Sequence, residues 1–333
     1  MYLISLTTKL LHFLPSELSH ILAMKGLKII YFLGIFKLFN IESNIKNLDE
    51  RDIRNLTNKV GIAAGLDKNG EYIDCLAAFG IDFIEVGTVT PRPQRGNQKP
   101  RIFRNKKEKS LINRLGFNNK GVDHLLKKLK SRKSKIIVGT SIGKNSDTPN
   151  DQAFEDYLFC LEKVYEFSDY IAVNISSPNT KDLRELSNSE FLNLLLCNIK
   201  TKQQSLSVLH GYKPILIKIS PDETPSDLET ICNSVIENKL DGIICSNTTI
   251  DHDNKFGSGG LSGALLTDKA TNALINVRSL VGDKLTLIAS GGVMSAEDYQ
   301  EKIDAGADLV QLYTGFIYEG PKLIKDILNL NSD

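Results

Sequence analysis

The 333-residue chain has no excess of either charge, because 41 basic residues stand against 40 acidic ones and the formal net charge is +1. No basic segment is interleaved with aromatic residues, which is the pattern of chains that bind nucleic acid. The most basic run, residues 127–133, is interpreted as the solvated end of a helix. We therefore expect no nucleic-acid partner.

Patterns typical of metal sites and disulfide frameworks are also missing. The five cysteines contain no C-x-x-C pair, and the five histidines show no metal-ligand spacing. Most of the cysteines lie among apolar residues, which predicts buried thiols in a reducing compartment. We expect neither a metal nor a disulfide.

The chain lacks an uninterrupted hydrophobic run. Residues 21–39 are long enough to span a membrane, but Lys25, Lys28 and Lys37 interrupt them, and each lysine is costly at mid-bilayer. No small-residue cleavage site follows, which argues against a signal peptide. Residues 1–39 combine four lysines and one acidic residue, Glu17, with excess apolar surface, a combination that favours helices lying on a membrane surface. A core helix and a true span are the alternatives.

The chain is therefore divided into a helical, membrane-associating extension over residues 1–40 and a body over residues 41–333. In the body, eight short runs rich in Ile, Val and Leu alternate with helical patterns, as parallel strands covered on both faces do. Eight such units predict an α/β fold, a (β/α)8 TIM barrel. An open doubly wound sheet fits less well, because no G-x-G-x-x-G follows the first strand. The predicted strands are Val60–Ala64, Phe83–Val86, Ile136–Gly139, Tyr170–Asn174, Ile215–Ile219, Gly242–Ser246, Leu285–Ala289 and Leu309–Leu312.

Barrels carry their active sites at the carboxyl ends of the strands. Here those ends are small or polar, and long loops, which are usually functional, follow strands two and four. Ser290-Gly291-Gly292 ends strand seven just before a helix expected to start at Ser295, and Tyr313-Thr314-Gly315 follows strand eight. Glycine lets backbone N–H groups approach an anion, so we predict a phosphate site there; loop-closing turns are the alternative.

Two lysines lie at predicted strand ends. Lys218 interrupts the apolar run Ile215–Ile219, and no carboxylate is placed by the sequence to pair with it. A buried lysine requires a partner or a function, and this one is interpreted as stabilising negative charge on a reduced flavin ring or an enolate. Lys68 follows strand one and is a candidate for binding a substrate carboxylate.

Together these motifs resemble the dihydroorotate dehydrogenase family, in its membrane-associated, quinone-linked class. The matching segments run in order over nearly the whole chain. They are residues 63–70 (AAGLDKNG), 85–94 (EVGTVTPRPQ), 113–119 (NRLGFNN), 174–180 (NISSPNT), 246–249 (SNTT) and 259–263 (GGLSG).

The resemblance implies an FMN-containing barrel that oxidises (S)-dihydroorotate to orotate in pyrimidine (UMP) biosynthesis. Ser177 would be the base that removes the C5 proton, while a hydride passes to N5 of the flavin. Matching FMN contacts are Ala64, Thr88, Ser141, Asn174, Lys218, Ser246, Gly263, Gly291, Tyr313 and Thr314. Matching substrate contacts are Lys68, Asn113, Arg114, Leu115, Gly116, Phe117, Asn174, Asn179, Asn247 and Thr248.

The soluble class of the family has a cysteine where Ser177 stands and lacks an N-terminal extension. In this extension Glu17 and His20 match the family's helix pattern by their spacing. The resemblance implies a quinone site lined by His20, Arg104 and Tyr313. It also implies a peripheral membrane protein, at the cytoplasmic face of the cell membrane in a bacterium or at an inner organelle membrane in a eukaryote.

The chain departs from the family pattern in places. Ser141 stands where the family usually has an asparagine that touches the flavin, so we expect an altered contact there. The segment before strand one lacks the usual Asn-Pro, and the loop over residues 251–259 is short.

Ser177 has no histidine beside it in the sequence. A serine base needs a proton acceptor, for which Thr180 or a bound water is a candidate, and residues 178–189 are the candidate lid. Two other functions remain open. One is a flavin-free, phosphate-binding isomerase or aldolase that acts through Lys218 or Lys68. The other is a peripheral membrane adaptor built on an inactive barrel.

Overall fold

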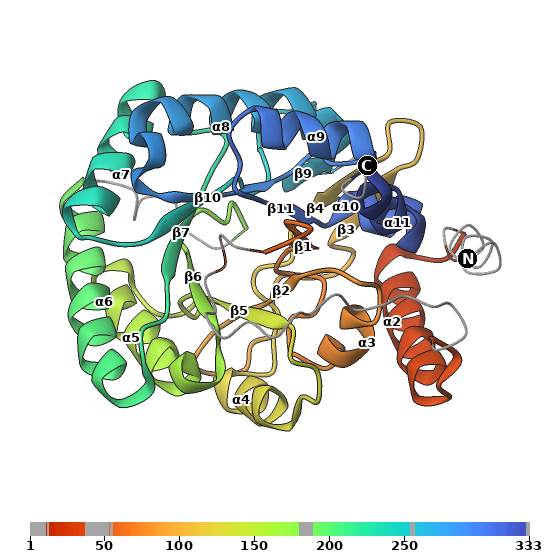
Figure 1. The fold of residues 1–333 in the computed structure, drawn as a ribbon, viewed down its shortest axis with the longest axis horizontal. Helices are drawn as coiled ribbons and strands as arrows, with labels where there is room; N and C mark the ends of the chain where they lie inside the picture. The colour runs from red at the N-terminus through yellow and green to blue at the C-terminus, as the bar shows by residue number, and fades with distance from the viewer. Residues whose placement is uncertain are drawn as a thin grey trace.

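Eight parallel strands close into a barrel in the order β1-β11-β10-β8-β7-β6-β5-β2 in the computed structural model, which describes residues 11, 13–36, 53, 56–179, 189–253 and 257–330 (Figure 1). All eight predicted strands are confirmed, and β2 and β5 extend furthest beyond their predicted ends. The strands are β1 (Val60–Ile62), β2 (Phe83–Val89), β5 (Ile137–Ile142), β6 (Tyr170–Asn174), β7 (Ile215–Ile219), β8 (Gly242–Cys245), β10 (Thr286–Ser290) and β11 (Leu309–Leu312).

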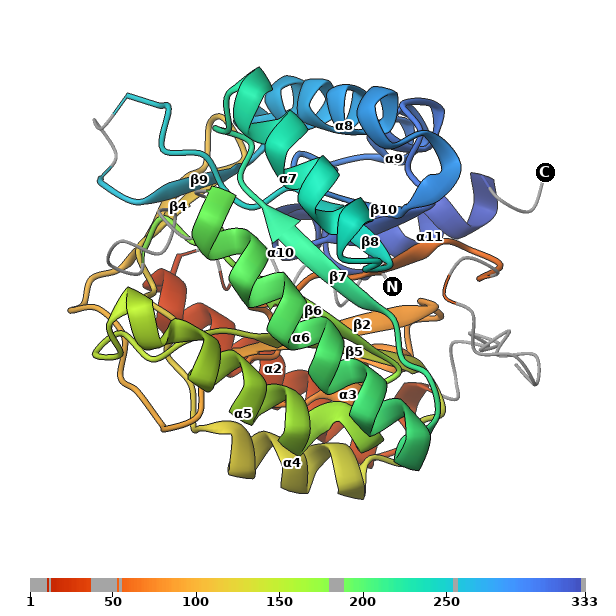
Figure 2. The same ribbon diagram turned by 90° about the vertical axis from the view of Figure 1, so that its left-hand side faces the viewer.

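Helices form a ring around the barrel (Figures 1 and 2). They are α3 (Ile73–Ala77), α4 (Val122–Ser131), α5 (Ala153–Val164), α6 (Ser189–His210), α7 (Pro225–Glu237), α8 (Thr267–Val281), α9 (Ala296–Asp304), α10 (Thr314–Glu319) and α11 (Pro321–Leu330). Helix α9 begins as predicted, because the Ser295 side chain caps it by accepting a hydrogen bond from the Asp298 N–H. Helix α4 buries Val122, Leu125 and Leu129 and exposes lysines at its end, as expected of the basic run.

Every residue of the eight barrel strands is buried. A large cluster packs between the strands and the helices, and a smaller one fills the barrel around Phe83, Tyr170 and Leu216. Glycines make room for the interior rings. A Cβ at Gly139 would lie 2.0 Å from the Tyr170 ring, so strand β5 accepts no side chain there. The barrel interior is therefore a packed core, and its top is the place for a site.

A small antiparallel sheet lies over one end of the barrel and was not predicted. It consists of β3 (Ile102–Asn105), β4 (Ser110–Asn113) and β9 (Gly260–Gly263), in the order β3-β4-β9 (Figure 2). Its strands are four residues long, and β9 carries two glycines, so neither periodicity nor propensity identifies them. The sheet joins the long loop after β2 to the segment after β8, and it thereby fixes both above the barrel.

Helix α2 (Ser16–Phe32) lies outside the ring, beside α3 and β3 (Figure 1). Lys28 attaches it to the body by donating to the Glu71 carbonyl over 2.9 Å. The helix leaves Leu18, Ile29 and Phe32 exposed, the last at 89% of its surface. No helix within the described residues is long and apolar enough to cross a membrane. The division at residue 40 falls outside the described residues and stays a prediction.

Candidate active site

One pocket opens at the carboxyl ends of the barrel strands. Its empty space is about 930 Å³ with the open mouth included. It brings together eighteen of the residues predicted from the sequence to touch cofactor or substrate or to act in catalysis. They are Ala64, Lys68, Thr88, Asn113, Leu115, Gly116, Phe117, Asn174, Ser177, Asn179, Lys218, Ser246, Asn247, Thr248, Gly263, Gly291, Tyr313 and Thr314.

Two predicted residues do not line this pocket. Ser141 is fully buried within β5, and its hydroxyl forms a hydrogen bond of 2.9 Å with that of Thr88. It therefore acts on the pocket only through Thr88, which does line it. Arg114 turns outward, where Nη2 donates to the Pro100 carbonyl over 2.9 Å and the guanidinium lies over the Phe103 ring. The backbone around Arg114 belongs to the pocket wall, but its side chain does not.

Ser177 follows β6 and is buried, with 6% of its surface exposed. Its Oγ accepts a hydrogen bond of 3.3 Å from the Asn179 N–H. The neighbouring Ser176 has a different role, because its Oγ accepts from Asn247 Nδ2 over 3.1 Å and so fixes that amide. Thr180 and most of the candidate lid over residues 178–189, namely residues 180–188, lie outside the described residues.

Lys218 has a carboxylate partner, which corrects the expectation from the sequence. Its Nζ lies 3.9 Å from Glu85 Oε1 on β2, and both side chains are almost completely buried. Burial lowers the pKa of Lys218, and the charge of Glu85 opposes that shift. The distance is too long for a hydrogen bond, and the Lys218 ammonium forms no hydrogen bond within the described part of the chain. Its ammonium therefore has donors available to a group in the pocket.

Glu85 itself is held inside the barrel by two neutral donors. The Tyr170 hydroxyl donates to Oε2 over 3.1 Å, and Gln311 Nε2 donates to the same oxygen over 2.8 Å. Burial and the nearby Glu85 charge raise the pKa of Tyr170, so it stays a neutral donor. Sequence patterns missed Glu85 and Gln311, although a carboxylate inside an apolar strand was a signal that a cation faces it.

Glycines that line the same pocket lie where the phosphate site was predicted. Gly263, Gly291 and Gly292 all have positive φ, and a Cβ at Gly292 would lie 2.3 Å from the Thr267 Cα. A side chain there would thus displace backbone. Gly315 lies beside them in the same pocket wall, after the loop from β11. The chain therefore brings backbone N–H groups of three separate loops to one surface, which suits an anion.

Lys68 lies at the boundary between this pocket and a second one. Its Nζ donates to the Gly65 carbonyl over 2.6 Å. Burial and the neighbouring charge of Arg101 lower the pKa of Lys68 to about 8, against the smaller opposing effects of Glu17 and Asp67. At neutral pH the group is mostly charged and can hold a carboxylate.

The second cavity lies between α2 and the barrel, with about 2150 Å³ of empty space, its opening to solvent included. It contains His20, Arg104 and Tyr313, the three residues predicted for the quinone site, among mainly apolar side chains. Burial and the charge of Lys68 lower the pKa of His20 to about 4, so His20 is neutral at pH 7. The two cavities share Lys68, Leu115 and Tyr313.

Arg101 connects the extension to the body and was missed by the sequence reasoning. It is 5% exposed, and its Nη2 lies 2.7 Å from Glu17 Oε1 on α2. Burial alone would raise the pKa of Glu17, but hydrogen bonds from Arg101 and Lys99 outweigh it and lower the pKa. Arg104 adds a second attachment by donating to the Leu14 carbonyl over 2.7 Å. The partners are 84 residues apart in the chain, so no local pattern pairs Arg101 with Glu17.

Comparisons with known proteins agree with this arrangement. Residues 51–331 match the sequence model of the family described as dihydroorotate dehydrogenase. A protein of Shewanella denitrificans named dihydroorotate dehydrogenase (quinone) is 47% identical over 98% of this chain and 98% of its own. One of Shewanella baltica with the same name is 52% identical over 82% of each chain.

Solved structures are similar over most of their length. The crystal structure of DHODH in complex with ferulenol from Eimeria tenella has a TM-score of 0.80 and 32% identity, covering 94% of this chain and 89% of that one. The ligand-free type from the same organism has a TM-score of 0.75 and 32% identity, covering 89% and 92%.

Proposed function

Because the chain belongs to the quinone-linked dihydroorotate dehydrogenase family, we propose that it oxidises (S)-dihydroorotate to orotate with bound FMN and a membrane quinone as the final acceptor. The observation that carries this proposal is the pair of cavities. A polar pocket at the strand ends suits a charged substrate, and an apolar cavity beneath α2 suits a lipid-soluble acceptor. They meet at Lys68, Leu115 and Tyr313, so electrons have a short path from one to the other.

The residues of the polar pocket fit a flavin mononucleotide. The buried Lys218 ammonium has donors without an acceptor among the described residues, and a flavin ring offers carbonyl and nitrogen acceptors. Gly263, Gly291 and Gly292 would hold the phosphate, while Thr88 and Asn174 would bond the ring. When bound, FMN would supply the hydride acceptor and pass electrons to the quinone.

The substrate would lie against the side chains that converge from several loops. Lys68 would hold its carboxylate as an ion pair. Asn179 donates to Asn113 Oδ1 over 3.2 Å, and Asn247 is fixed by Ser176, so both amides are already oriented before a ligand arrives. Preoriented donors need little reorganisation when charge develops on the substrate carbonyl.

Ser177 would remove the C5 proton. Its oxygen would form the new bond to that proton while its own hydroxyl proton leaves for a neighbouring acceptor or water. The oxygen already accepts from the Asn179 N–H, which holds it in place and leaves its hydroxyl proton free to be passed on. Burial of the group excludes competing water from the reacting carbon.

Helix α2 would bring the protein to the membrane. Its outward side chains Leu18, Ile29 and Phe32 are exposed and apolar, which suits peripheral contact with lipid. A quinone leaving the bilayer beneath α2 would enter the cavity that holds His20, Arg104 and Tyr313. The location would then be the membrane surface, on the cytoplasmic face in a bacterium and at an inner organelle membrane in a eukaryote.

Ser177→Ala tests the assignment of the base, with Ser176→Ala as the matched control. We expect Ser177→Ala to keep its flavin and bind orotate while anaerobic flavin reduction by dihydroorotate slows by about 100-fold or more. Ser176→Ala should stay within about tenfold of the unaltered protein, because Asn247 Nδ2 keeps its second hydrogen bond, to Asn174 Oδ1 over 3.3 Å. Stopped-flow absorbance measures both rates. An unchanged rate in Ser177→Ala contradicts the role of Ser177.

A further inference from the structure

The pocket wall contains a strained segment of backbone. Gly116 and Phe117 both line the pocket, with φ of +66° and +50°. Positive φ is uncommon for a bulky residue such as phenylalanine and persists only where the surroundings enforce it. The segment therefore needs partners that hold it.

Two side-chain amides donate hydrogen bonds to the backbone carbonyls of this segment. Gln94 Nε2 donates to the Gly116 carbonyl over 3.0 Å, and Asn119 Nδ2 donates to the Phe117 carbonyl over 2.7 Å. The backbones of Gln94 and Asn119 also pair with each other in both directions, over 3.1 and 3.0 Å. Neither side chain lines the pocket, so both act only through the segment that does.

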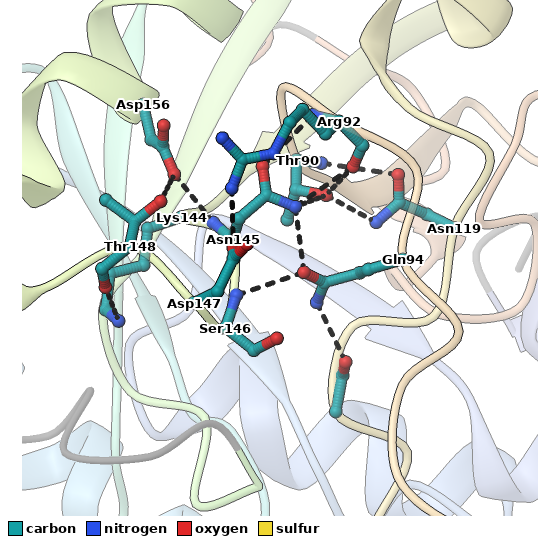
Figure 3. Close-up of polar contacts among 11 residues, drawn as sticks. Thr90, Arg92, Gln94, Asn119, Lys144, Asn145, Ser146, Asp147, Thr148 and Asp156 are labelled. Atoms are coloured by element: carbon teal, nitrogen blue, oxygen red, sulfur yellow. Dashed lines mark hydrogen bonds and ion pairs between the residues drawn. The ribbon is translucent and has the colours of Figure 1, made fainter.

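The loop after β5 sets the orientation of the Gln94 amide. Asn145 Nδ2 donates to Gln94 Oε1 over 2.9 Å, and the Ser146 N–H donates to the same oxygen over 3.0 Å (Figure 3). Two donors on one oxygen leave the Gln94 nitrogen directed at Gly116. Asn145 is 2% exposed, and its own N–H donates to Asp156 on α5 over 2.7 Å. A series of hydrogen bonds therefore connects α5 to the pocket wall through Asn145 and Gln94.

We propose that Gln94, oriented by Asn145, is a positioning residue that sets the Gly116–Phe117 backbone for substrate binding. The inference rests on the proposed function, since the ligand is taken to be dihydroorotate or orotate. It predicts that loss of the Gln94 donor affects orotate affinity more than FMN affinity, because the segment lies on the predicted substrate side of the pocket.

The test compares Gln94→Met and Gln94→Glu with the control Asp147→Asn in the flavin-loaded protein. Methionine keeps the length of the side chain but removes both its donor and the oxygen that accepts from Asn145 and Ser146. Glutamate keeps the acceptor but presents no donor to Gly116. Asp147 belongs to the same cluster, but its ion pair with Arg92 is exposed and does not reach the pocket wall (Figure 3). Orotate affinity is measured by isothermal titration calorimetry, and flavin content and Tm are recorded beside it.

We expect the orotate Kd to rise about fivefold or more in both Gln94 variants, the size expected for losing the part-buried hydrogen bond to the Gly116 carbonyl, with flavin content unchanged. Asp147→Asn should stay within about twofold. Should Gln94→Glu fail to fold, Gln94→Met decides alone. An orotate Kd within twofold of the unaltered protein overturns the inference, and so does an equal loss of FMN and orotate. Failure of the unaltered protein to bind orotate would instead contradict the proposed function.

Discussion

Replacing Glu85 by glutamine is expected to destabilise the protein by about 3–4 kcal/mol at pH 6. Glutamine has nearly the same shape, and its amide oxygen can accept the hydrogen bonds from Tyr170 and Gln311. The change therefore removes the charge and places an NH2 group where Oε1 faced Lys218. At the 3.9 Å that separates Lys218 Nζ from Glu85 Oε1, two unit charges interact by about 4 kcal/mol at an effective dielectric constant near 20. Removing one partner of a buried ion pair leaves the other charge buried without compensation, which typically lowers the free energy of unfolding by about 3–5 kcal/mol.

The pH dependence of this loss separates a charge effect from a packing effect. Burial already lowers the pKa of Lys218, and the charge of Glu85 opposes that shift, so Glu85→Gln lowers the pKa further. Lys218, buried without a charged partner in this variant, can then release its proton, and this release becomes easier as the pH rises. Between the lowered pKa of Lys218 in the folded variant and the ordinary lysine pKa, the folded variant binds fewer protons than its unfolded chain. The free energy of unfolding of Glu85→Gln therefore increases with pH in this interval. We expect a smaller loss at pH 9 than at pH 6.

Urea unfolding of the flavin-free protein at pH 6 and pH 9 measures the effect, because bound FMN would offer Lys218 an acceptor and add its own binding energy to the measured stability. Lys218→Met and the double variant complete a mutant cycle. The double variant should be about 2 kcal/mol more stable than Glu85→Gln at pH 6, because no charge is then left without a partner. The reasoning is refuted by a loss below about 1 kcal/mol, or by a loss that is the same at both pH values.

Two further predictions concern the boundary of the cavities. The pKa of Lys68 is about 8, and only its protonated form holds a carboxylate, so the orotate Kd should rise about tenfold per pH unit above pH 8. Lys68→Met should bind weakly without that dependence, and a flat profile to pH 9.5 in the unaltered protein contradicts the assignment. Glu17→Ala should raise the quinone KM several-fold and expose α2 to protease, because it removes the buried Arg101 contact. Lys99→Ala, which removes the exposed partner of the same carboxylate, should change the quinone KM less than twofold, and equal effects of the two variants would contradict this account.

Much of the fold could be predicted because each barrel strand is a short apolar run of β-prone residues. The polar residues that follow those runs then converge by the geometry of a parallel barrel, which is why Lys68, Ser177 and Lys218 meet in one pocket. The β3-β4-β9 sheet escaped prediction because its four-residue strands carry too few residues for a period to appear.

Contacts between distant segments could not be read from the sequence. Glu85 faces Lys218 only because β2 and β7 curve around the same interior, and Arg101 meets Glu17 only because α2 returns to the barrel. The outward turn of Arg114 depends on the Pro100 carbonyl, which no local pattern places beside it. Side-chain direction in loops is set by such partners rather than by propensity.

The absorption spectrum of the purified protein, taken under anaerobic conditions before and after dihydroorotate and again after quinone, shows whether the chain is a flavin-dependent, quinone-linked dehydrogenase. We expect a yellow protein with a flavin spectrum that bleaches when dihydroorotate is added and returns when quinone is added. A colourless protein that takes up no FMN, or a flavin spectrum that dihydroorotate leaves unchanged, would contradict this function.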